Sequence, residues 1–309
     1  MLFKRLLVIA VVITSFGLSS CQAIDVIPED SVWDNPSTYY GVHHDFVLAG
    51  MPSYVDESTV FRLSSEQEAA LLMAIQVEQG QTKFFFTSDH ALSLDRLFAY
   101  VESLMPFSFR LSLGELSYSQ KDKNVLTLYS LELLPVFEET VYLSDEVDAF
   151  TQAHIQTGLS NFDTLKSIHD ELILNTEYDT SILELDLTQI PSHLSFEALG
   201  LFQENTAVCS GYARAFNALA KQQGIPSLMI SSEVMQHAWN LVYDGSAWKY
   251  VDVTFDDPIP DLKNKVRYTY FMLDEGTFVL DGKHHFDEST ELRLNAQDYL
   301  EFASYVFGE

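Results

Sequence analysis

The hydrophobic pattern of the N-terminal third predicts a small domain of mixed helix and strand. Apolar residues recur with a helical period in two segments, each bounded by capping or helix-breaking residues. Alternating apolar and polar residues elsewhere predict strands, and a polar turn over 121–124 joins the last two. The predicted elements are helices over 64–79 and 93–105 and strands over 41–49, 83–87, 107–118 and 125–136. We therefore expect an α+β domain over residues 41–140, whose role the pattern does not indicate.

The pattern of residues 145–309 predicts a second α+β domain. Several helical stretches are followed by a short apolar strand and then by two strand-like arms around a tight polar turn. The predicted elements are helices over 145–157, 161–175, 195–202 and 209–223, a strand over 228–231, and a hairpin with arms over 237–243 and 248–255. This hairpin and the helix before it carry the residues with candidate chemistry.

The helix that starts at Cys209 combines a buried face with a thiol at its first turn. Cys209 lies one turn before an apolar stripe made of Tyr212, Ala213, Phe216, Leu219 and Ala220. Asn205 and Thr206 can accept hydrogen bonds from the free first-turn amides, and Gly224 ends the helix. The positive end of the helix dipole favours the thiolate, which is the reactive form of cysteine.

The hairpin supplies a histidine and a carboxylate in register. A loop of two or four residues between Tyr243 and Trp248 places His237 and Asp252 on one face as diagonal neighbours, about 7–8 Å apart between backbones. A loop of odd length would send Asp252 to the opposite face. The turn therefore decides whether the two side chains can meet.

Chemistry assigns these residues the roles of a catalytic triad. Cys209 is the candidate nucleophile, His237 the base that later gives its proton to the leaving amine, and Asp252 the group that orients the imidazole. The backbone N–H of Cys209 is one candidate oxyanion donor. Each residue taken alone has a simpler interpretation: His237 as a packed histidine, Asp252 as a turn or cap residue, and residues 256–258 as a turn. The combination of these residues with Cys209 favours catalysis.

The first forty residues predict an exported, lipid-anchored protein. A charged start is followed by an apolar run over 6–18, which is shorter than the ~20 residues of a spanning helix. The run ends in Leu18-Ser19-Ser20-Cys21, which resembles a bacterial lipobox. We expect a signal peptide over 1–20, lipidation of Cys21, and an acidic tether over 21–40; an ordinary signal peptide cut nearby is the alternative. The expected location is extracytoplasmic, on the cell surface or the periplasmic side.

Composition limits the partners and cofactors. The chain has 309 residues and a formal charge of −28, which argues against nucleic acid and against adhesion to anionic lipid. The charge agrees with solubility or, less simply, with a basic partner. Of the two cysteines, only Cys209 remains in the folded body if Cys21 is acylated, so no disulfide is expected. One cysteine and one histidine fall short of a zinc pattern, and we expect no metal and no cofactor.

Three motifs in order resemble the bacterial transglutaminase-like superfamily. They are residues 206–213 (TAVCSGYA), 237–240 (HAWN) and 251–258 (VDVTFDDP). Residues 167–179 resemble the leading helix of this family, and residues 270–273 and 284–285 resemble its last segment. The resemblance covers roughly residues 160–290. Two departures are Phe255, where the family usually has Trp, and the absence of a glycine in 231–236, before the histidine.

The resemblance implies a papain-like α+β fold, in which a cysteine helix packs on an antiparallel sheet bearing the histidine and the aspartate. It maps the catalytic cysteine, histidine and aspartate of the family onto Cys209, His237 and Asp252. Tyr212 and Trp239 are candidates for the substrate cleft, although a tryptophan such as Trp239 is more often a core residue. The expected activity is that of a protease, amidase or transglutaminase on a protein or peptide. The alternative is a non-catalytic binding or assembly lipoprotein with a vestigial triad.

Overall fold

The structure is a computed structural model and describes residues 60–63, 65–78, 80–88, 91–119, 125–137, 143–185, 193–262, 264–280 and 282–285. The predicted signal peptide, tether, strand over 41–49 and turn over 121–124 lie outside these residues. Contacts between Cα atoms divide the described chain into two compact units. One unit holds residues 60–101 and 109–134, and the other holds 102–108 and 135–285.

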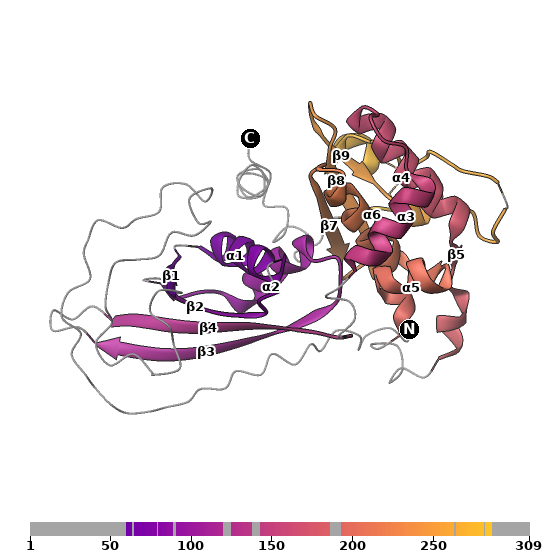
Figure 1. Ribbon diagram of the computed structural model, residues 1–309. Coiled ribbons are helices and arrows are strands. Elements are labelled where there is room, and N and C mark those ends of the chain that lie inside the picture. Colours follow the sequence, from indigo (N-terminus) through magenta and orange to yellow (C-terminus); the bar gives the residue numbers. More distant parts are fainter. Residues whose placement is uncertain are drawn as a thin grey trace. The chain divides into compact units, whose positions relative to one another are not determined.

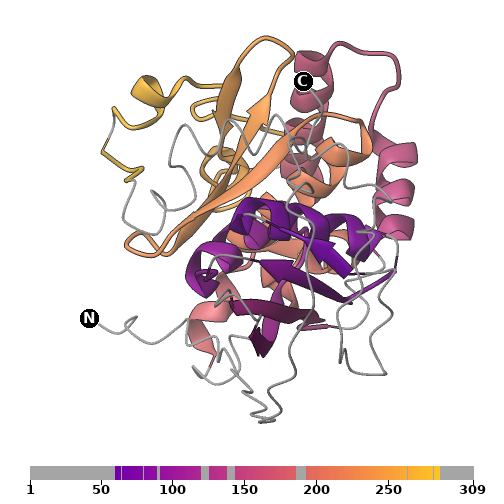
Figure 2. The same ribbon diagram turned by 90° about the vertical axis from the view of Figure 1, so that its left-hand side faces the viewer.

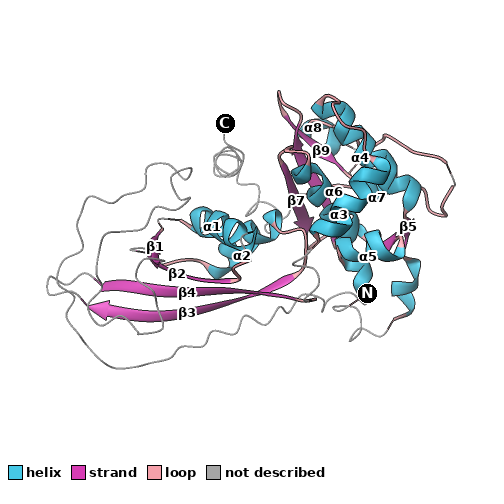
Figure 3. Cartoon of the chain, in the orientation of Figure 1, coloured by secondary structure: helices cyan, strands magenta, loops and turns pink. Residues whose placement is uncertain are grey.

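The unit nearer the N-terminus is built on a four-stranded sheet. Its elements are β1 (Val60–Arg62), α1 (Glu66–Glu78), β2 (Lys83–Ser88), α2 (Leu94–Leu104), β3 (Phe109–Ser119) and β4 (Val125–Pro135), shown in Figures 1 and 3. The strand order is β1-β2-β4-β3, with β1 parallel to β2 and β2 antiparallel to β4. The predicted helices and strands over 64–136 are confirmed, with ends that differ by one or two residues.

Local chemistry explains two of these elements. The hydroxyl of Ser65 accepts a hydrogen bond from the backbone N–H of Glu68, 3.2 Å away, which caps the start of α1. On the sheet, Phe86 of β2 stacks on Tyr129 of β4 with ring centroids 5.1 Å apart. These two residues are paired directly in the antiparallel register, so their aromatic contact stabilises that register.

The larger unit surrounds one buried helix. Its helices are α3 (Ser144–His154), α4 (Asn161–Asn175), α5 (Ala198–Glu204), α6 (Cys209–Gln222), α7 (Val253–Asp256) and α8 (Glu275–Phe278). Its strands are β5 (Glu177–Tyr178), β6 (Thr206–Ala207), β7 (Ser227–Ser232), β8 (His237–Tyr243) and β9 (Trp248–Val251). Strands β7-β8-β9 form an antiparallel sheet, drawn in orange in Figure 2, and β5 pairs with β6 in parallel.

Helix α6 is the centre of this unit. All residues from Gly211 to Ala220 are buried, and α4, α5, β7 and β8 contact the helix. The predicted apolar stripe is present, but burial extends around the whole helix. Two polar residues on it are therefore buried as well, and each donates one hydrogen bond to a main-chain carbonyl: Arg214 to Met105, and Asn217 to Ser103. Within the described part of the chain, Nε of Arg214 and Oδ1 of Asn217 have no hydrogen-bond partner.

The predicted caps of the cysteine helix are wrong. Asn205 has a φ of 55° and ends α5, where its N–H bonds to the carbonyl of Leu201. Asparagine tolerates this left-handed conformation at a helix C-terminus better than most residues. Thr206 starts β6, and the N-cap position of α6 falls to Val208, which has no side-chain cap bond. The amides of the first turn of α6 therefore receive no hydrogen bond from an N-cap side chain.

The register of the hairpin is confirmed, but its second arm is shorter than predicted. Tyr243 pairs with Trp248 across a four-residue loop. Strand β9 ends at Val251, whereas a strand to residue 255 was expected. Asp252 is the N-cap of the helical turn α7, and its Oδ1 accepts a bond of 2.9 Å from the N–H of Phe255. A carboxylate is a strong N-cap, so the chain leaves the sheet at this residue.

The close approach of Gly211 to a neighbouring main chain generates a stability prediction. A Cβ at Gly211 would lie 2.4 Å from the carbonyl oxygen of Ser195. We expect Gly211→Ala to lose about 1–3 kcal/mol of unfolding free energy, as overpacked substitutions do. Gly276→Ala in helix α8 is the matched control, because a Cβ at Gly276 would meet nothing within 4 Å. Denaturant unfolding curves would contradict the prediction if the two variants were equally stable.

Candidate functional site

Cys209 stands at the first position of α6 and is partly exposed. Strand-like pairing of the preceding residues fixes its place: Val208 donates to the carbonyl of Ser195 at 2.9 Å, and Ala207 pairs with Tyr178. The sulfur lies 3.9 Å from the carbonyl oxygen of Gln236, at the end of the turn that precedes β8. The thiol therefore faces the start of the strand that carries His237.

His237 bridges the thiol and the carboxylate. Its Nε2 lies 2.6 Å from Oδ2 of Asp252, and its ring stacks on Phe255 at 4.3 Å between centroids. Burial lowers the pKa of His237, but the Asp252 carboxylate and hydrogen bonds to Asp252 and Cys209 outweigh burial and raise the pKa to about 10. Because Nε2 is occupied by Asp252, Nδ1 is the ring nitrogen left to face the sulfur.

Phe255 explains one departure from the family pattern. It occupies the position where tryptophan is usual, and its ring is nearly parallel to the imidazole of His237, at 20°. An aromatic ring of either kind at this position can hold the imidazole in plane. The substitution therefore preserves the contact with the histidine.

The turn before His237 explains the other departure. Gln236 has a φ of 54°, a conformation in which glycine is the usual residue. Its side-chain amide donates a hydrogen bond of 2.8 Å to the carbonyl of Glu233, and the N–H of Met235 bonds to the hydroxyl of Ser232. The turn thus has local hydrogen bonds that support a left-handed residue without glycine.

Asp252 is completely buried and is held from several directions. Its backbone N–H donates to the carbonyl of Tyr270 at 3.0 Å. Oδ1 accepts from Phe255, and Oδ2 accepts both from His237 and from Nε2 of His284, which is 2.9 Å away. Burial raises the pKa of Asp252, but the charge and hydrogen bond of His237 and the bond from His284 lower it to about 2. The carboxylate is therefore ionised at neutral pH.

A second buried pair lies behind Asp252. Asp256 accepts backbone hydrogen bonds from Thr269 and Tyr270, and its Oδ2 lies 3.3 Å from Nε2 of His169. Burial lowers the pKa of His169, and hydrogen bonds to Asp170 and Asp256 outweigh burial and raise it. Asp256 therefore holds the main chain whose Tyr270 carbonyl in turn accepts from Asp252.

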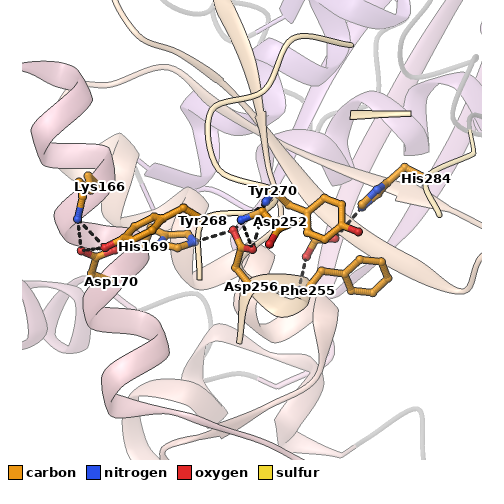
Figure 4. Close-up of polar contacts among 10 residues, drawn as sticks. Lys166, His169, Asp170, Asp252, Phe255, Asp256, Tyr268, Tyr270 and His284 are labelled. Atoms are coloured by element: carbon orange, nitrogen blue, oxygen red, sulfur yellow. Dashed lines mark hydrogen bonds and ion pairs between the residues drawn. The ribbon is translucent and has the colours of Figure 1, made fainter. Parts of the chain in front are cut away.

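This second pair continues to the surface of α4. Asp170 bonds to Nδ1 of His169 at 3.1 Å and to the ammonium of Lys166, and Tyr268 donates to the same carboxylate at 2.9 Å. Figure 4 shows these side chains in a row from Lys166 to Asp256, with Asp252 and His284 beyond. From the sequence, residues 256–258 read as a simple turn, because the partners of Asp256 are distant in the chain.

The two predicted cleft residues do not present a surface to a substrate. Tyr212 and Trp239 have relative exposures of 0% and 1%. The hydroxyl of Tyr212 donates to Oδ2 of Asp257 at 2.5 Å. Burial raises the pKa of Asp257 to about 6, although the bond from Tyr212 opposes this. Both aromatic residues are core residues, because α6 and β8 are buried on all sides at these positions.

Tyr178 is a residue near the thiol that the sequence did not single out. It lies on β5, opposite Ala207, and is partly buried. Burial, and then the negative charge of the Cys209 thiolate, raise the pKa of Tyr178 to about 12, so its phenol stays protonated at neutral pH. The two-residue pairing that brings it here is too short to give a strand pattern.

Three of these groups have the composition of a metal site. Ligand atoms of His237, Asp252 and His284 lie within 4.8 Å of one another. However, Nε2 of His237 and Nε2 of His284 lie 2.6 and 2.9 Å from Oδ2 of Asp252. Ligands of a tetrahedral zinc ion with bonds of about 2.0–2.1 Å lie about 3.3 Å apart. The spacing therefore fits hydrogen bonds to a carboxylate better than a metal.

A cysteine at a helix start, packed on an antiparallel sheet beside histidine and aspartate, defines a thiol-enzyme fold. Residues 148–253 match the family model described as the transglutaminase-like superfamily. This part of the chain is a transglutaminase-like domain, and the mixed helix-and-sheet fold expected from the resemblance is confirmed.

Comparison with solved structures gives distant matches. A TGase crystal structure aligns with 15% identity and a TM-score of 0.31 over 55% of this chain, and the match spans half of the TGase chain. A protein from Cytophaga hutchinsonii, described as a candidate cysteine protease, aligns with 14% identity and a TM-score of 0.28, covering 52% of this chain and 68% of that one. No curated protein matches the chain. Among the described residues, no helix has the length and apolar character to cross a membrane.

The His237–Asp252 contact generates a prediction about charge. We expect Asp252→Asn to lower the pKa of His237 well below about 10, because the interactions with Cys209 are then left alone to oppose burial. A raised folded-state pKa adds stability that is complete below about pH 6.5 and is lost as pH rises through about 10. The wild type should therefore lose more thermal stability than the variant between pH 7 and 10.

The measurement is an NMR titration of the histidine ring signals, combined with melting curves at each pH. Asp274→Asn is the control, because Asp274 is an exposed carboxylate that bonds to Lys249. An unchanged His237 titration in Asp252→Asn would show that the carboxylate does not hold the proton on the imidazole.

Proposed function

We propose that this protein is a thiol enzyme that acts on amide bonds of a protein or peptide. The observation that carries the proposal is the contact of 2.6 Å between His237 and Asp252, made by an imidazole that also bonds to Cys209. The transglutaminase-like domain over 148–253 supports it. The pKa of about 10 means that His237 carries its proton at neutral pH, which favours a thiolate on Cys209 as its counter-ion.

In the first half of the reaction, the Cys209 thiolate attacks the carbonyl carbon of the amide. A carbon–sulfur bond forms and the carbonyl electrons move onto oxygen. When the tetrahedral intermediate collapses, the carbon–nitrogen bond breaks and His237 gives its proton to the leaving amine. The products of this half are a free amine and a thioester on Cys209.

In the second half, the neutral His237 takes a proton from water or from an acceptor amine as it attacks the thioester. The carbon–sulfur bond breaks, and the thiolate and the imidazolium are restored. Water gives a carboxylic acid and an amine gives a new amide. Asp252 stays ionised throughout and keeps His237 in the tautomer and orientation that these steps need.

Two donors near the thiol fit the charge that develops on the carbonyl oxygen. The backbone N–H of Cys209 lies at the start of α6, where no side chain caps the helix. Tyr178 pairs with Ala207, two residues before Cys209, and its phenol is influenced by the charge of Cys209 and remains protonated at neutral pH. Donors fixed before the reaction stabilise an oxyanion without reorganisation, and each is worth about 10²–10³ in rate. These two groups are our candidates for the oxyanion hole.

Alkylation of Cys209 tests the proposal. In a Cys21→Ser background, Cys209 is the only cysteine of the sequence. We expect iodoacetamide to label it faster at pH 7 than it labels a free thiol, and we expect His237→Ala to slow labelling at least about tenfold, because the imidazolium no longer stabilises the thiolate. Labelling is followed by mass spectrometry.

His154→Ala is the control, because His154 lies on α3 and bonds to Glu171. Ordinary reactivity of Cys209 together with no effect of His237→Ala would reject the enzyme and favour the alternative, a binding or assembly lipoprotein. Proteins trapped on a reactive Cys209 would identify the substrate.

We also propose that the enzyme acts outside the cytoplasm, anchored through a lipid on Cys21. The lipobox-like sequence before Cys21 supports this location. A diacylglyceryl cysteine carries two acyl chains, enough for stable anchoring. We expect Cys21→Ser to move the protein from the membrane fraction to the soluble exported fraction, and detergent phase partitioning would measure this. An unchanged membrane fraction would contradict the lipid anchor, and Ser20→Ala is the matched control because the small residue is kept.

A further inference from the structure

His284 is a buried histidine whose one side-chain hydrogen bond, among the described residues, goes to Asp252. Its relative exposure is 1%, and its Nε2 lies 2.9 Å from Oδ2 of the carboxylate. Its Nδ1 is buried and has no partner in the described part of the chain. Figure 4 shows the imidazole directed at Asp252 from the opposite end to His169.

The surroundings of His284 are aromatic. Its ring lies 3.8 Å from the ring of Phe278, 5.0 Å from Tyr270 and 5.3 Å from Trp239, measured between centroids. An apolar residue would fill such a cage without a desolvation cost, whereas a buried imidazole with one hydrogen bond is costly. Cavity filling alone therefore does not explain a histidine at this position.

The proton on His284 can be placed by accounting for donors and acceptors. Asp252 is ionised and can only accept, so Nε2 of His284 must carry a hydrogen. A second hydrogen on Nδ1 would be a buried donor without a partner, which is more costly than a bare lone pair. His284 therefore directs an Nε2–H at the carboxylate.

We propose that His284 is a positioning residue of the thiol site, which holds Oδ2 of Asp252 and shares it with His237. This inference rests on the proposed thiol site. The charge on one oxygen is divided between two N–H donors, and Oδ1 is fixed by the N–H of Phe255. The carboxylate thus cannot rotate away, and its attraction for the proton of His237 is moderated.

The hydrogen bond from His284 to Asp252 makes His237 a stronger acid than it would be without that bond. The described groups that face His237 and can carry charge or titrate are Cys209 from α6, Asp252 from the N-cap of α7, and His284 from residues 282–285. Removing the N–H of His284 leaves the Asp252 carboxylate less neutralised. The attraction between Asp252 and the His237 imidazolium then increases, and His237 becomes a weaker acid toward a leaving amine.

Two substitutions of similar size separate the donor from the packing. Glutamine places an N–H near the position of Nε2, whereas methionine fills a similar volume without a donor. We expect His284→Met to weaken the acidity of His237 about three- to tenfold in its dissociation constant, because one charge-assisted hydrogen bond is lost. We expect His284→Gln to stay within twofold of the wild type. Both constants come from NMR titration of the His237 ring.

If His284 serves only for packing, we expect a different result from the two variants. The two variants would then show the same His237 titration, whatever their stability, and this would overturn the proposal. A wild-type measurement covers the case in which His284→Met does not fold. Nitrogen chemical shifts of the His284 ring must show a hydrogen on Nε2, and a bare Nε2 overturns the proposal.

These readouts are made on the resting protein and need no substrate. If Cys209 shows ordinary reactivity toward iodoacetamide, the proposed function fails while the titrations can still support the shared carboxylate. If Cys209 is reactive but the glutamine and methionine variants titrate alike, the enzyme stands and the role of His284 is rejected.

Discussion

The structure depends on one buried carboxylate. Asp252 stands where β9 ends and α7 begins, and it has no exposed surface. An isolated charge in such a place would cost many kcal/mol, so it persists only because donors surround it. Those donors come from β8, from the first turn of α7 and from residue 284, and the backbone of Asp252 bonds to Tyr270. The charge thus joins two distant parts of the chain, β8 and residue 284, to the junction of β9 and α7, and the backbone bond adds Tyr270.

The arrangement around this carboxylate also places the thiol. Asp252 holds His237, the turn before His237 brings the Gln236 carbonyl to the sulfur, and Phe255 packs on the imidazole. The helix that carries Cys209 is buried along most of its length, so its first residue has little freedom to move. The chemistry is therefore positioned by the most buried elements of the unit, α6 and β8.

The sequence predicts the elements and the contact between His237 and Asp252 well because these depend on local patterns. Period and turn chemistry locate α4 and the hairpin, and the alternation of side chains puts His237 and Asp252 on one face. Prediction from the sequence fails where a residue lies between two elements and can belong to either. Asn205 ends α5 instead of capping α6, and Asp252 caps α7 instead of continuing β9. The contacts of His284 and Asp256 join residues far apart in the chain, which no local pattern reveals.

The double use of Asp252 has a consequence for how the proposed activity would be lost in related chains. The Asp252 carboxylate joins a strand to a helix, and His237 neutralises its charge. Replacing either Asp252 or His237 would therefore weaken the fold as well as the proposed chemistry. Cys209 is partly exposed, and the bonds of its sulfur to described residues are the contact of 3.9 Å with the Gln236 carbonyl and the bond to the side chain of His237, neither of which joins two elements of the main chain. An inactive descendant would therefore replace the cysteine first and keep the histidine and aspartate. Retention of those two residues in a related chain reports on folding, and only the thiol reports on turnover.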